Sequence, residues 1–488
     1  MNTEKRIKWL FLIIPFLAVL SRYPFLDNDF YFICATGKLI TETGFPHTDM
    51  LSMHSNMNVV IQQWLSSVVY WFIYDLAGKI GVIVFTYIVY YLICLLTYRI
   101  CKLISGNPTV SAICSALSDL MIFNAYVVSR PQIITFALLL AEVFFLELCV
   151  KEKKTRYLAA LPILSIFLVN CHASMWLMFF VFILPYIAAS LPLKIKNFEY
   201  TPCCNIGHLL IVSVISFAAG IINPYGTKGM FYLFSSYGQD KLNSAIKEMQ
   251  PTNIATLDGK VFFACIALFA VVALIYRKRA FTPRLVFLFA GTILLALMHY
   301  KSLSYFWLFG IPSCSYLLKD LDISLFFENE FFKKNKSVPT TILAVIFLLF
   351  TLAGVKTFFE RKNEAMSRQA HIDHLENIVG ILNDSSEEVV LYANFNDGQY
   401  FEFRGFHPYI DGRAELFVKK LNGEFDYFNE YYTLLNAGIY YRDFIDKYDF
   451  NYLVISKDTD RYLYATVSKD EDFEPVYESD DVILYTIK

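Results

Sequence analysis

Residues 8–31, KWLFLIIPFLAVLSRYPFLDNDFY, decide the fold. The apolar run 8–26 is about as long as a membrane-spanning helix, which needs about 20 mostly apolar residues. Three basic residues lie within the first eight positions, and the acidic pair Asp27 and Asp29 follows the run. Because lysine and arginine collect on the cytoplasmic side of a membrane, the helix is predicted to start in the cytoplasm and to expose the acidic pair outside.

The composition extends this interpretation to most of the chain. Of the 488 residues, 56% are hydrophobic and only 18% are charged, and the mean hydropathy is +0.45. A soluble domain has about 25% charged residues. A net charge of −2 gives no basic field for a polyanion, which argues against nucleic-acid binding. The ten cysteines show no metal-ligand spacing and indicate neither disulfides nor a zinc site.

Further apolar runs predict an α-helical polytopic membrane protein of about eleven spans. The predicted spans are 8–26, 80–100, 109–128, 132–150, 157–171, 174–191, 207–222, 261–276, 284–299, 303–318 and 338–358. The additional run 59–77 is ambiguous. If it does not span, the alternate loops all contain basic clusters, most clearly KEKKTR at 151–156 and RKRAFTPR at 277–284. We therefore predict that 59–77 is an interfacial or re-entrant helix and that the N-terminus is cytoplasmic.

This topology divides the chain into a transmembrane domain, 1–360, and a C-terminal extracytoplasmic domain, 361–488. Two predicted outer loops, 27–79 and 223–259, are long, and long loops in compact proteins are usually functional. The C-terminal part is rich in Asp, Glu and Tyr and is predicted to form a small α/β domain. Its expected helices are His371–Asn383 and Tyr431–Tyr448, and its expected strands are Glu388–Ala393, Tyr452–Ser456 and Val482–Ile487.

The acidic pair is the first candidate site. Asp27 and Asp29 emerge beside an apolar surface, where partial desolvation raises the pKa of a carboxylate and makes it a better base. Such a base would activate an acceptor hydroxyl. Alternatively, two carboxylates at this spacing hold a divalent cation on a phosphate. The structural alternative is that Asp27 and Asp29 are simply solvated where the first helix leaves the membrane and have no catalytic role.

Other polar groups fall on the same predicted side of the membrane. Arg130 precedes Pro131 and is therefore expected at a helix N-terminus, an arrangement suited to a phosphate, although an arginine there also reaches lipid headgroups. Lys301 is a second outward cation. The polar stretches 170–172, 223–226 and residue Glu248 complete the set.

Short motifs follow one another along the chain: Asp27-Asn28-Asp29-Phe30-Tyr31, Gly37, Gly44-Phe45-Pro46, Thr48-Asp49-Met50-Leu51-Ser52, Gln63-Trp64-Leu65, Arg130-Pro131-Gln132, Asn170-Cys171-His172, Asn223-Pro224-Tyr225-Gly226 and Ile410-Asp411-Gly412-Arg413. In order and spacing the chain resembles a bacterial branch of the GT-C superfamily. That superfamily includes protein O-mannosyltransferases, oligosaccharyltransferases and lipid A aminoarabinose transferases. The resemblance covers nearly the whole chain.

The resemblance implies an inverting glycosyltransferase that uses a polyprenyl-phosphate-linked sugar at the outer leaflet. Asp29 is the expected general base, and Asp27 is its partner or a metal ligand, with a divalent metal such as Mg or Mn left open. Arg130 and Lys301 are expected to clamp the donor phosphate. Contacts to the sugar or the acceptor are expected from His172, Asp49 and Glu248.

The implied partners are the lipid bilayer, the lipid-linked donor and a glycan, lipid or protein acceptor, with no nucleic acid. The implied location is a bacterial plasma (inner) membrane. The alternatives are a lipid or glycan flippase or transporter, an O-antigen-type polymerase or ligase, and an inactive glycolipid-binding scaffold. Transporters place charges at the bilayer midplane on broken helices related by a repeat. Here the polar residues gather at one face and no repeat is visible, which favours the transferase.

Overall fold

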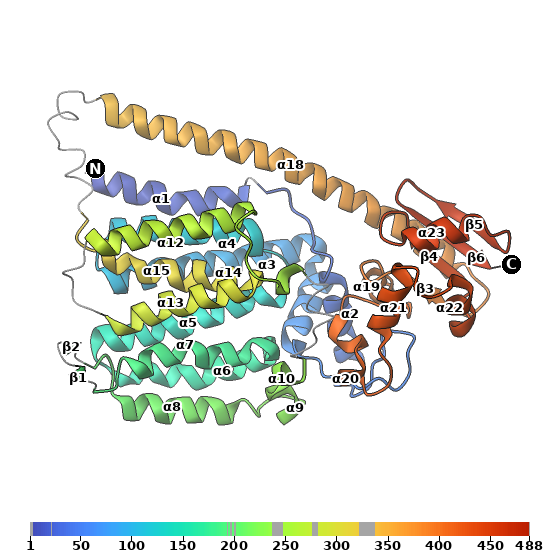
Figure 1. Cartoon of the computed structure of the whole chain (residues 1–488), viewed down its shortest axis with the longest axis horizontal. Helices are drawn as coiled ribbons and strands as arrows, with labels where there is room; N and C mark the ends of the chain where they lie inside the picture. Colours follow the sequence, from blue (N-terminus) through green and yellow to red (C-terminus); the bar gives the residue numbers. More distant parts are fainter. Residues whose placement is uncertain are drawn as a thin grey trace.

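The computed structural model describes residues 3–20, 22–192, 194–195, 198–199, 202–236, 247–275, 282–321 and 337–487. Most of the basic loop 277–284 and part of the outer loop 223–259 lie outside the described residues. Within them, helices run side by side in a bundle, and a smaller unit of helices and strands lies at one end of it (Figure 1).

The bundle consists of apolar helices at the positions of the predicted spans. They are α1 (Thr3–Leu20), α3 (Trp64–Ser105), α4 (Pro108–Tyr126), α5 (Pro131–Glu152), α6 (Ala160–Cys171), α7 (Trp176–Ala188), α8 (Ile206–Ala219), α12 (Leu257–Ile275) and α13 (Pro283–Met298). Among the described residues, α3, α4, α5 and α12 are long and apolar enough to cross a membrane. The other helices of the bundle are shorter, and the total of eleven spans stays a prediction.

The predicted span 303–318 is helical but irregular. Short pieces follow one another: α14 (Leu303–Tyr305), a π turn at Phe306–Gly310, α15 (Ile311–Cys314) and a 3₁₀ turn at Ser315–Leu318. Every residue from Leu303 to Ser315 is buried. Packing against neighbouring helices therefore maintains a segment whose own hydrogen-bond ladder is interrupted.

Helix α3 consists of two helices joined at Gly78. Gly78 has a φ of 58°, a left-handed conformation that glycine adopts without steric cost. The first helix, 64–77, is roughly 21 Å long at 1.5 Å per residue, shorter than the hydrocarbon core of about 30 Å. The structure thus separates 64–77 from the span that follows. The helix begins five residues later than the predicted segment 59–77, and its place at the interface stays a prediction.

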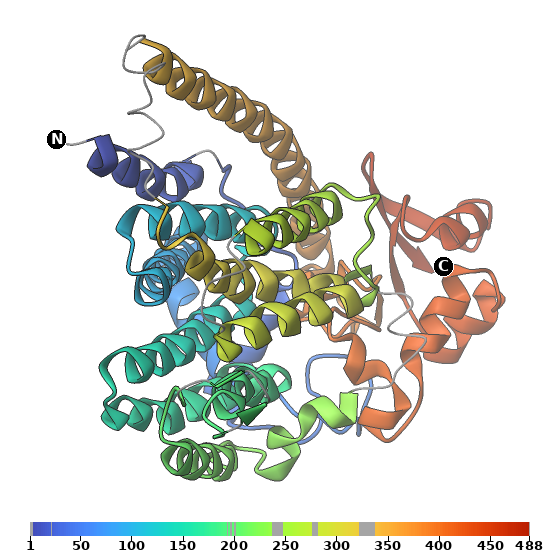
Figure 2. The same ribbon diagram turned by 60° about the vertical axis from the view of Figure 1, so that its left-hand side comes forward.

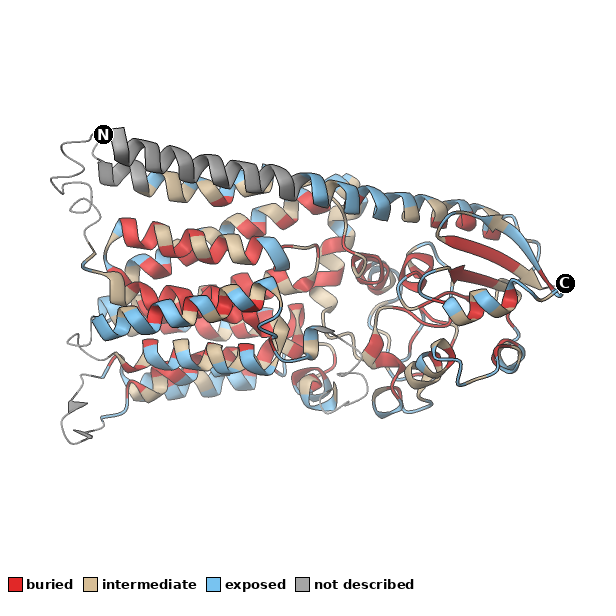
Figure 3. Ribbon diagram, turned by 45° about the horizontal axis from the view of Figure 1, so that its top comes forward, coloured by how far each residue is buried: buried red, intermediate tan, exposed pale blue. Residues whose placement is uncertain are grey.

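Many large apolar side chains of the bundle are exposed. Exposed and buried residues alternate along its helices (Figure 3). Large hydrophobic side chains that are at least 69% exposed include Leu76, Ile80, Val214, Leu257 and Leu274. A soluble monomer rarely exposes so much contiguous apolar surface. This surface and the apolar helices agree with a protein embedded in a membrane.

A four-stranded mixed sheet forms the centre of the C-terminal unit. Its strand order is β3-β4-β6-β5, with β3 parallel to β4 and the other two pairs antiparallel. The strands are β3 (Leu391–Tyr392), β4 (Tyr452–Ser456), β5 (Phe473–Glu478) and β6 (Val482–Ile487). The bounds of β4 and β6 equal the predicted ones, β3 is shorter than predicted, and β5 was not predicted.

The C-terminal unit also contains short helices. They are α19 (Gly398–Phe403), α20 (Lys419–Asn422), α21 (Tyr427–Leu435), α22 (Tyr441–Tyr448) and α23 (Arg461–Val467). The predicted helix 431–448 is divided into α21 and α22, because the chain turns between them, where Ala437 has a φ of 56°. The predicted helix 371–383 is the end of α18 (Ser337–Asn383), which continues through the predicted domain boundary at residue 360 and links the bundle to the sheet (Figure 2).

Helix α2 (Phe30–Thr43) lies between the bundle and the C-terminal unit (Figure 1). Gly37 permits its close approach to the first part of α3, because a Cβ atom there would lie 2.1 Å from the carbonyl oxygen of Ser67. On another side of α2, the Tyr31 ring packs against Tyr400 and Phe403. The acidic pair directly before α2 is therefore positioned at the junction of the two units.

Candidate active site

The acidic pair is bound to Arg130. The Arg130 Nε donates a hydrogen bond to Asp27 Oδ1 at 2.6 Å, and Nη1 lies 2.9 Å from Asp29 Oδ2. Asp27 Oδ1 also accepts the backbone N–H of Asp29 at 3.1 Å. Arg130 immediately precedes α5, whose first residue is Pro131, as predicted. Two motifs about 100 residues apart thus form one charged cluster.

The two carboxylates differ in exposure. The side chain of Asp27 is 9% exposed and that of Asp29 is 31% exposed. Burial raises the pKa of Asp29 from 3.8 to about 7, although Arg130 opposes the shift. A carboxylate that is reachable and titrates near neutral pH has the properties of a general base. Asp27, which already accepts two hydrogen bonds at one oxygen, has the properties of an orienting group.

Lys301 lies in a 3₁₀ turn, Tyr300–Ser302, directly after α13. Burial lowers the pKa of its ammonium, and the carboxylates Glu415 and Glu248 oppose that shift. Among the described residues, Lys301 forms no ion pair within 4 Å. Glu415 and Glu248 also raise the pKa of Asp29, so the Lys301 ammonium and the acidic pair share one charged environment.

His172 directly follows α6. Its Nδ1 is 2.9 Å from Thr135 Oγ1. Burial, assisted by the positive charge of Lys301, lowers the pKa of His172 to about 3, so the imidazole is neutral. Direct contacts therefore join three of the predicted site residues, Asp27, Asp29 and Arg130. Glu248 acts electrostatically on Asp29, Arg130 and Lys301, and Lys301 acts on His172.

Asp49 belongs to a second charged cluster, around Arg413. The Arg413 Nη1 lies 2.5 Å from Asp49 Oδ1, and Nη2 lies 2.6 Å from Asp411 Oδ2 and 2.8 Å from Glu402 Oε1. Asp49 Oδ2 also accepts hydrogen bonds from the backbone N–H and the hydroxyl of Ser52. The motifs 48–52 and 410–413 are therefore one cluster, in which Asp49 joins the first outer loop to the C-terminal unit.

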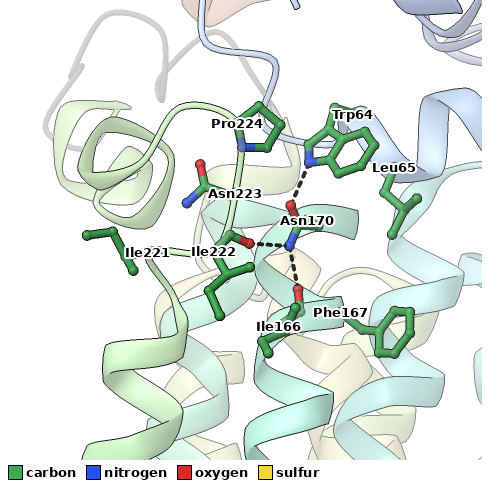
Figure 4. Close-up of a pocket in the computed structure, with 9 residues that line it drawn as sticks. All are labelled: Trp64, Leu65, Ile166, Phe167, Asn170, Ile221, Ile222, Asn223 and Pro224. Atoms are coloured by element: carbon green, nitrogen blue, oxygen red, sulfur yellow. Dashed lines mark hydrogen bonds between the residues drawn. The ribbon is translucent and has the colours of Figure 1, made fainter.

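Asn170 supports an apolar hollow of about 430 Å³ (Figure 4). Its Oδ1 accepts a hydrogen bond from Trp64 Nε1 at 2.7 Å, and its Nδ2 donates to the carbonyls of Ile166 and Ile222 at 2.7 and 2.8 Å. With its amide thus used, Asn170 holds three segments together. The hollow is lined by Trp64, Leu65, Ile166, Phe167, Asn170, Ile221, Ile222, Asn223 and Pro224.

Asn223 organises the turn that contains the NPYG motif. Its Oδ1 accepts the N–H of Tyr225, and its Nδ2 donates to the carbonyls of Gly220 and Gly226. The Tyr225 hydroxyl donates to the carbonyl of Pro46 at 3.0 Å. The motif thus joins the turn at 223–226 to Pro46 in the predicted outer loop 27–79 and has a structural role.

The acidic pair does not fit a divalent metal in this arrangement. The guanidinium of Arg130 contacts both carboxylates, where a shared cation would bind. Mg²⁺ and Mn²⁺ need several oxygen ligands. In the described part of the chain, no group of three or more His, Cys, Asp or Glu side chains is arranged to hold a metal ion.

Glu415 was not predicted as a site residue. It lies in the 3₁₀ turn Ala414–Phe417 of the C-terminal unit and acts electrostatically on both Asp29 and Lys301. No local spacing connects residues so far apart in the chain. In the sequence, the signal that could have pointed to Glu415 was the motif 410–413, which ends two residues before Glu415.

No family model and no curated protein sequence matches the chain. Solved structures match it in fold. An oligosaccharyltransferase from Archaeoglobus fulgidus, tethered to an acceptor peptide containing the NVT sequon, is 12% identical, with 99% of this chain and 74% of that chain covered and a TM-score of 0.62. The chain shares the fold of this oligosaccharyltransferase.

Two further solved structures of oligosaccharyltransferases from Archaeoglobus fulgidus also match the fold of this chain. AglB from the same organism, in complex with an inhibitory peptide and a dolichol-phosphate, is 11% identical, with 96% of this chain and 71% of that chain covered and a TM-score of 0.61. The oligosaccharyltransferase in complex with Zn and sulfate is 12% identical, with 99% of this chain and 73% of that chain covered and a TM-score of 0.57. These matches show that the chain shares the fold of these oligosaccharyltransferases over nearly its whole length.

Proposed function

We propose that the protein is a membrane glycosyltransferase that transfers a sugar from a polyprenyl-phosphate-linked donor to an extracytoplasmic acceptor. The observation that carries this proposal is the Asp27–Arg130–Asp29 cluster at the junction of an oligosaccharyltransferase-like fold. One carboxylate of the cluster is accessible and has a pKa near 7.

In the proposed reaction, Asp29 accepts the proton of an acceptor hydroxyl while the hydroxyl oxygen attacks the anomeric carbon. The bond from that carbon to the phosphate oxygen breaks, and the polyprenyl phosphate leaves with the electron pair, so the anomeric centre inverts. Asp27 and Arg130 hold Asp29 in place. Fixed positioning of the base is a large part of the rate enhancement in such a reaction.

The leaving phosphate requires cations. Lys301 is one, because its ammonium has no ion-pair partner among the described side chains. Arg130 is the second, since its Nη2 donates to no described residue while Nε and Nη1 hold the acids. Charge-assisted hydrogen bonds to phosphate are about twice as strong as neutral ones. His172 and Glu248, beside these groups, contact the sugar or the acceptor.

A lipid-linked donor suits the surroundings of this cluster. The hollow beside Asn170 is walled mainly by apolar side chains, and Asn170, one of the two asparagines that line it, lies two positions before His172. The AglB structure contains a dolichol-phosphate, and another structure of the archaeal enzyme carries an acceptor peptide. These ligands support a polyprenyl phosphate in the donor and a glycan, lipid or peptide as acceptor.

The test uses membranes that contain the protein, a set of radiolabelled polyprenyl-phosphate hexoses and extracts of bacterial envelopes as acceptor. Transfer of label into an acceptor fraction is expected for at least one sugar, and it should depend on Asp29. The proposal fails if the purified protein binds neither the donors nor polyprenyl phosphate, because all of the proposed chemistry requires that complex.

We further propose that the N-terminus and the 151–156 loop are cytoplasmic and that the unit after α18 is extracytoplasmic in a bacterial plasma membrane. The basic clusters support this orientation. Single cysteines introduced at exposed Lys153 and Glu474 should react with an impermeant thiol reagent on opposite sides. Labelling of both from the same side would refute the orientation.

A further inference from the structure

The residue between the two acids contacts the other unit of the protein. Asp27 and Asp29 lie 2.6 and 2.9 Å from the Arg130 guanidinium, directly before the bundle helix α5. The side chain of Asn28 instead donates a hydrogen bond from Nδ2 to the backbone carbonyl of Asn396, in the C-terminal unit, at 3.0 Å. Three consecutive residues thus join two units, with the acids bound to one unit and the amide bound to the other.

The carbonyl that accepts this bond belongs to a firmly held turn. The Oδ1 atom of Asn394 accepts the backbone N–H groups of Asn396 and Asp397 at 2.9 and 3.0 Å. Its Nδ2 atom donates to the carboxylates of Asp397 and Asp460 at 2.8 and 3.1 Å. Asn394 is 1% exposed and Asp397 is 5% exposed. Buried hydrogen bonds therefore fix the backbone that presents the Asn396 carbonyl to Asn28.

The same turn leads directly into α19, which packs against α2. The centroid of the Tyr31 ring lies 5.0 Å from that of Tyr400 and 5.6 Å from that of Phe403. The C-terminal unit therefore holds the start of α2 at two points, by a hydrogen bond at Asn28 and by ring packing at Tyr31. Asp29 lies between these two points in the chain.

We infer that Asn28 is a positioning residue, whose hydrogen bond to the C-terminal unit fixes the backbone from which the Asp29 carboxylate reaches the acceptor. The inference rests on the proposed function. Asp29 directly follows Asn28, so a freer residue 28 allows the carboxylate to move relative to Arg130 and to the acceptor hydroxyl. A displacement of about 1 Å in an active site can cost roughly 10²-fold in rate. The C-terminal unit thereby acts on the reaction through the position of the base.

Asn58 provides a matched control. Like Asn28, it belongs to the segment 27–79 and donates from Nδ2 to a backbone carbonyl of the C-terminal unit, that of Asn422, at 3.1 Å. Unlike Asn28, it is not next to either acid. Replacing either asparagine with alanine removes one contact of the same kind between the same parts of the protein. The two variants should therefore unfold at similar midpoints in detergent.

The experiment measures turnover and donor affinity of the full-length protein in detergent micelles, with the radiolabelled polyprenyl-phosphate hexose and the acceptor fraction that the wild type uses. Asn28→Ala should lower turnover at saturating donor about tenfold, with donor affinity unchanged, because the phosphate-binding cations are retained. Asn28→Gln keeps the amide donor on a side chain one methylene longer and should recover part of the loss. Asn58→Ala should retain wild-type turnover and affinity.

The outcomes separate this inference from the proposed function. Wild-type turnover in Asn28→Ala would show that Asn28 does not position the base, and the glycosyltransferase proposal would be unaffected. Equal losses of turnover in Asn28→Ala and Asn58→Ala would show a general effect of joining the two units and would also overturn the inference. If the wild type neither binds nor transfers from any of the donors, the proposed function fails, and the role of Asn28 fails with it.

Discussion

Two arginine–carboxylate clusters connect the parts of this protein, and they differ in how open they are. Arg413 holds three carboxylates that are at most 2% exposed, and its own side chain is 14% exposed. Arg130 holds two carboxylates and is 29% exposed, and one of its partners, Asp29, is 31% exposed. The first cluster is closed to solvent, whereas the second is open.

The difference indicates different roles. In the closed cluster, burial raises the pKa of Glu402 and so reduces the negative charge around Arg413. Its groups satisfy one another and join the first outer loop to the C-terminal unit. In the open cluster, the guanidinium and one carboxylate retain unused hydrogen-bonding capacity. Stability should therefore depend mainly on Arg413, and catalysis mainly on the groups around Arg130.

The largest effect is expected at Asp29. Asp29→Asn keeps the size of the side chain but cannot accept a proton near neutral pH, so turnover should fall by about 10²- to 10⁴-fold with donor affinity little changed. Transfer from a radiolabelled polyprenyl-phosphate sugar measures this. Since the pKa of Asp29 is about 7, wild-type turnover should decrease as the pH falls below that value and the base becomes protonated.

The closed cluster supplies the control for this experiment. Asp49→Asn removes a carboxylate of similar chemistry that contacts Arg413 and lies outside the open cluster. Its main effect should be lower stability, with turnover per folded molecule retained. Wild-type turnover in Asp29→Asn and in Asp27→Asn would leave the reaction without a base and would contradict the mechanism.

Breaking the closed cluster should produce the next largest effect. Arg413→Met leaves Asp49, Asp411 and Glu402 buried without their cation, and removing one partner of a buried ion pair costs about 3–5 kcal/mol. Thermal unfolding in detergent should show a large decrease in the midpoint. Arg368→Met removes an exposed arginine that pairs with Glu364 at 2.8 Å, and exposed pairs are worth about 0–1 kcal/mol. Equal midpoints for the two variants would refute the contrast.

The sequence predicted those features that depend on local pattern. Apolar runs gave the positions of the bundle helices, and short runs rich in β-branched and aromatic residues gave β4 and β6 with their observed bounds. Five of the six residues of β5 are not buried, so its pattern carries no such signal. The chain reversal near Ala437 was not predictable either, because an alanine with positive φ is maintained by its surroundings rather than by its own preference.

Only part of the candidate site was predicted, because here too the sequence reveals only features that depend on local pattern. Asp27, Asp29 and Arg130 stand at helix ends, which hydropathy and proline position reveal. The pairing of Asp49 with Arg413 depends on how the C-terminal unit packs against the segment 27–79. Contacts between residues hundreds of positions apart leave no trace in local spacing.

The open cluster allows a smaller, more specific test at Arg130. Arg130→Ala should weaken donor binding about tenfold or more, because a charge-assisted hydrogen bond is worth roughly 1.5–3 kcal/mol. Arg130→Lys should be affected less, since it keeps the charge but loses the planar fork. Binding of polyprenyl phosphate to purified protein measures both. Wild-type affinity in Arg130→Ala would mean that Arg130 only orients the acids.

The smallest effect is expected at His371 on α18, in a third cluster that is intermediate between the other two. Its Nδ1 lies 2.6 Å from Asp481 Oδ2 and its Nε2 lies 2.8 Å from Asp397 Oδ1. Near this cluster, Asn28 between the two acids donates a hydrogen bond to the carbonyl of Asn396. Despite burial, the two carboxylates raise the pKa of His371 from 6.5 to about 9.

The sign of the resulting pH dependence follows from this shift. A histidine with a raised pKa in the folded state stabilises the protein fully below pH 6.5, and this contribution is lost as the pH rises through about 9. His371→Gln should therefore lower the unfolding midpoint at pH 6 and leave it unchanged at pH 10, with turnover at pH 7.5 little affected. A midpoint difference that is independent of pH would show that the imidazole contributes through packing alone. A large loss of turnover would instead mean that the Asn28–Asn396 contact transmits its position to Asp29.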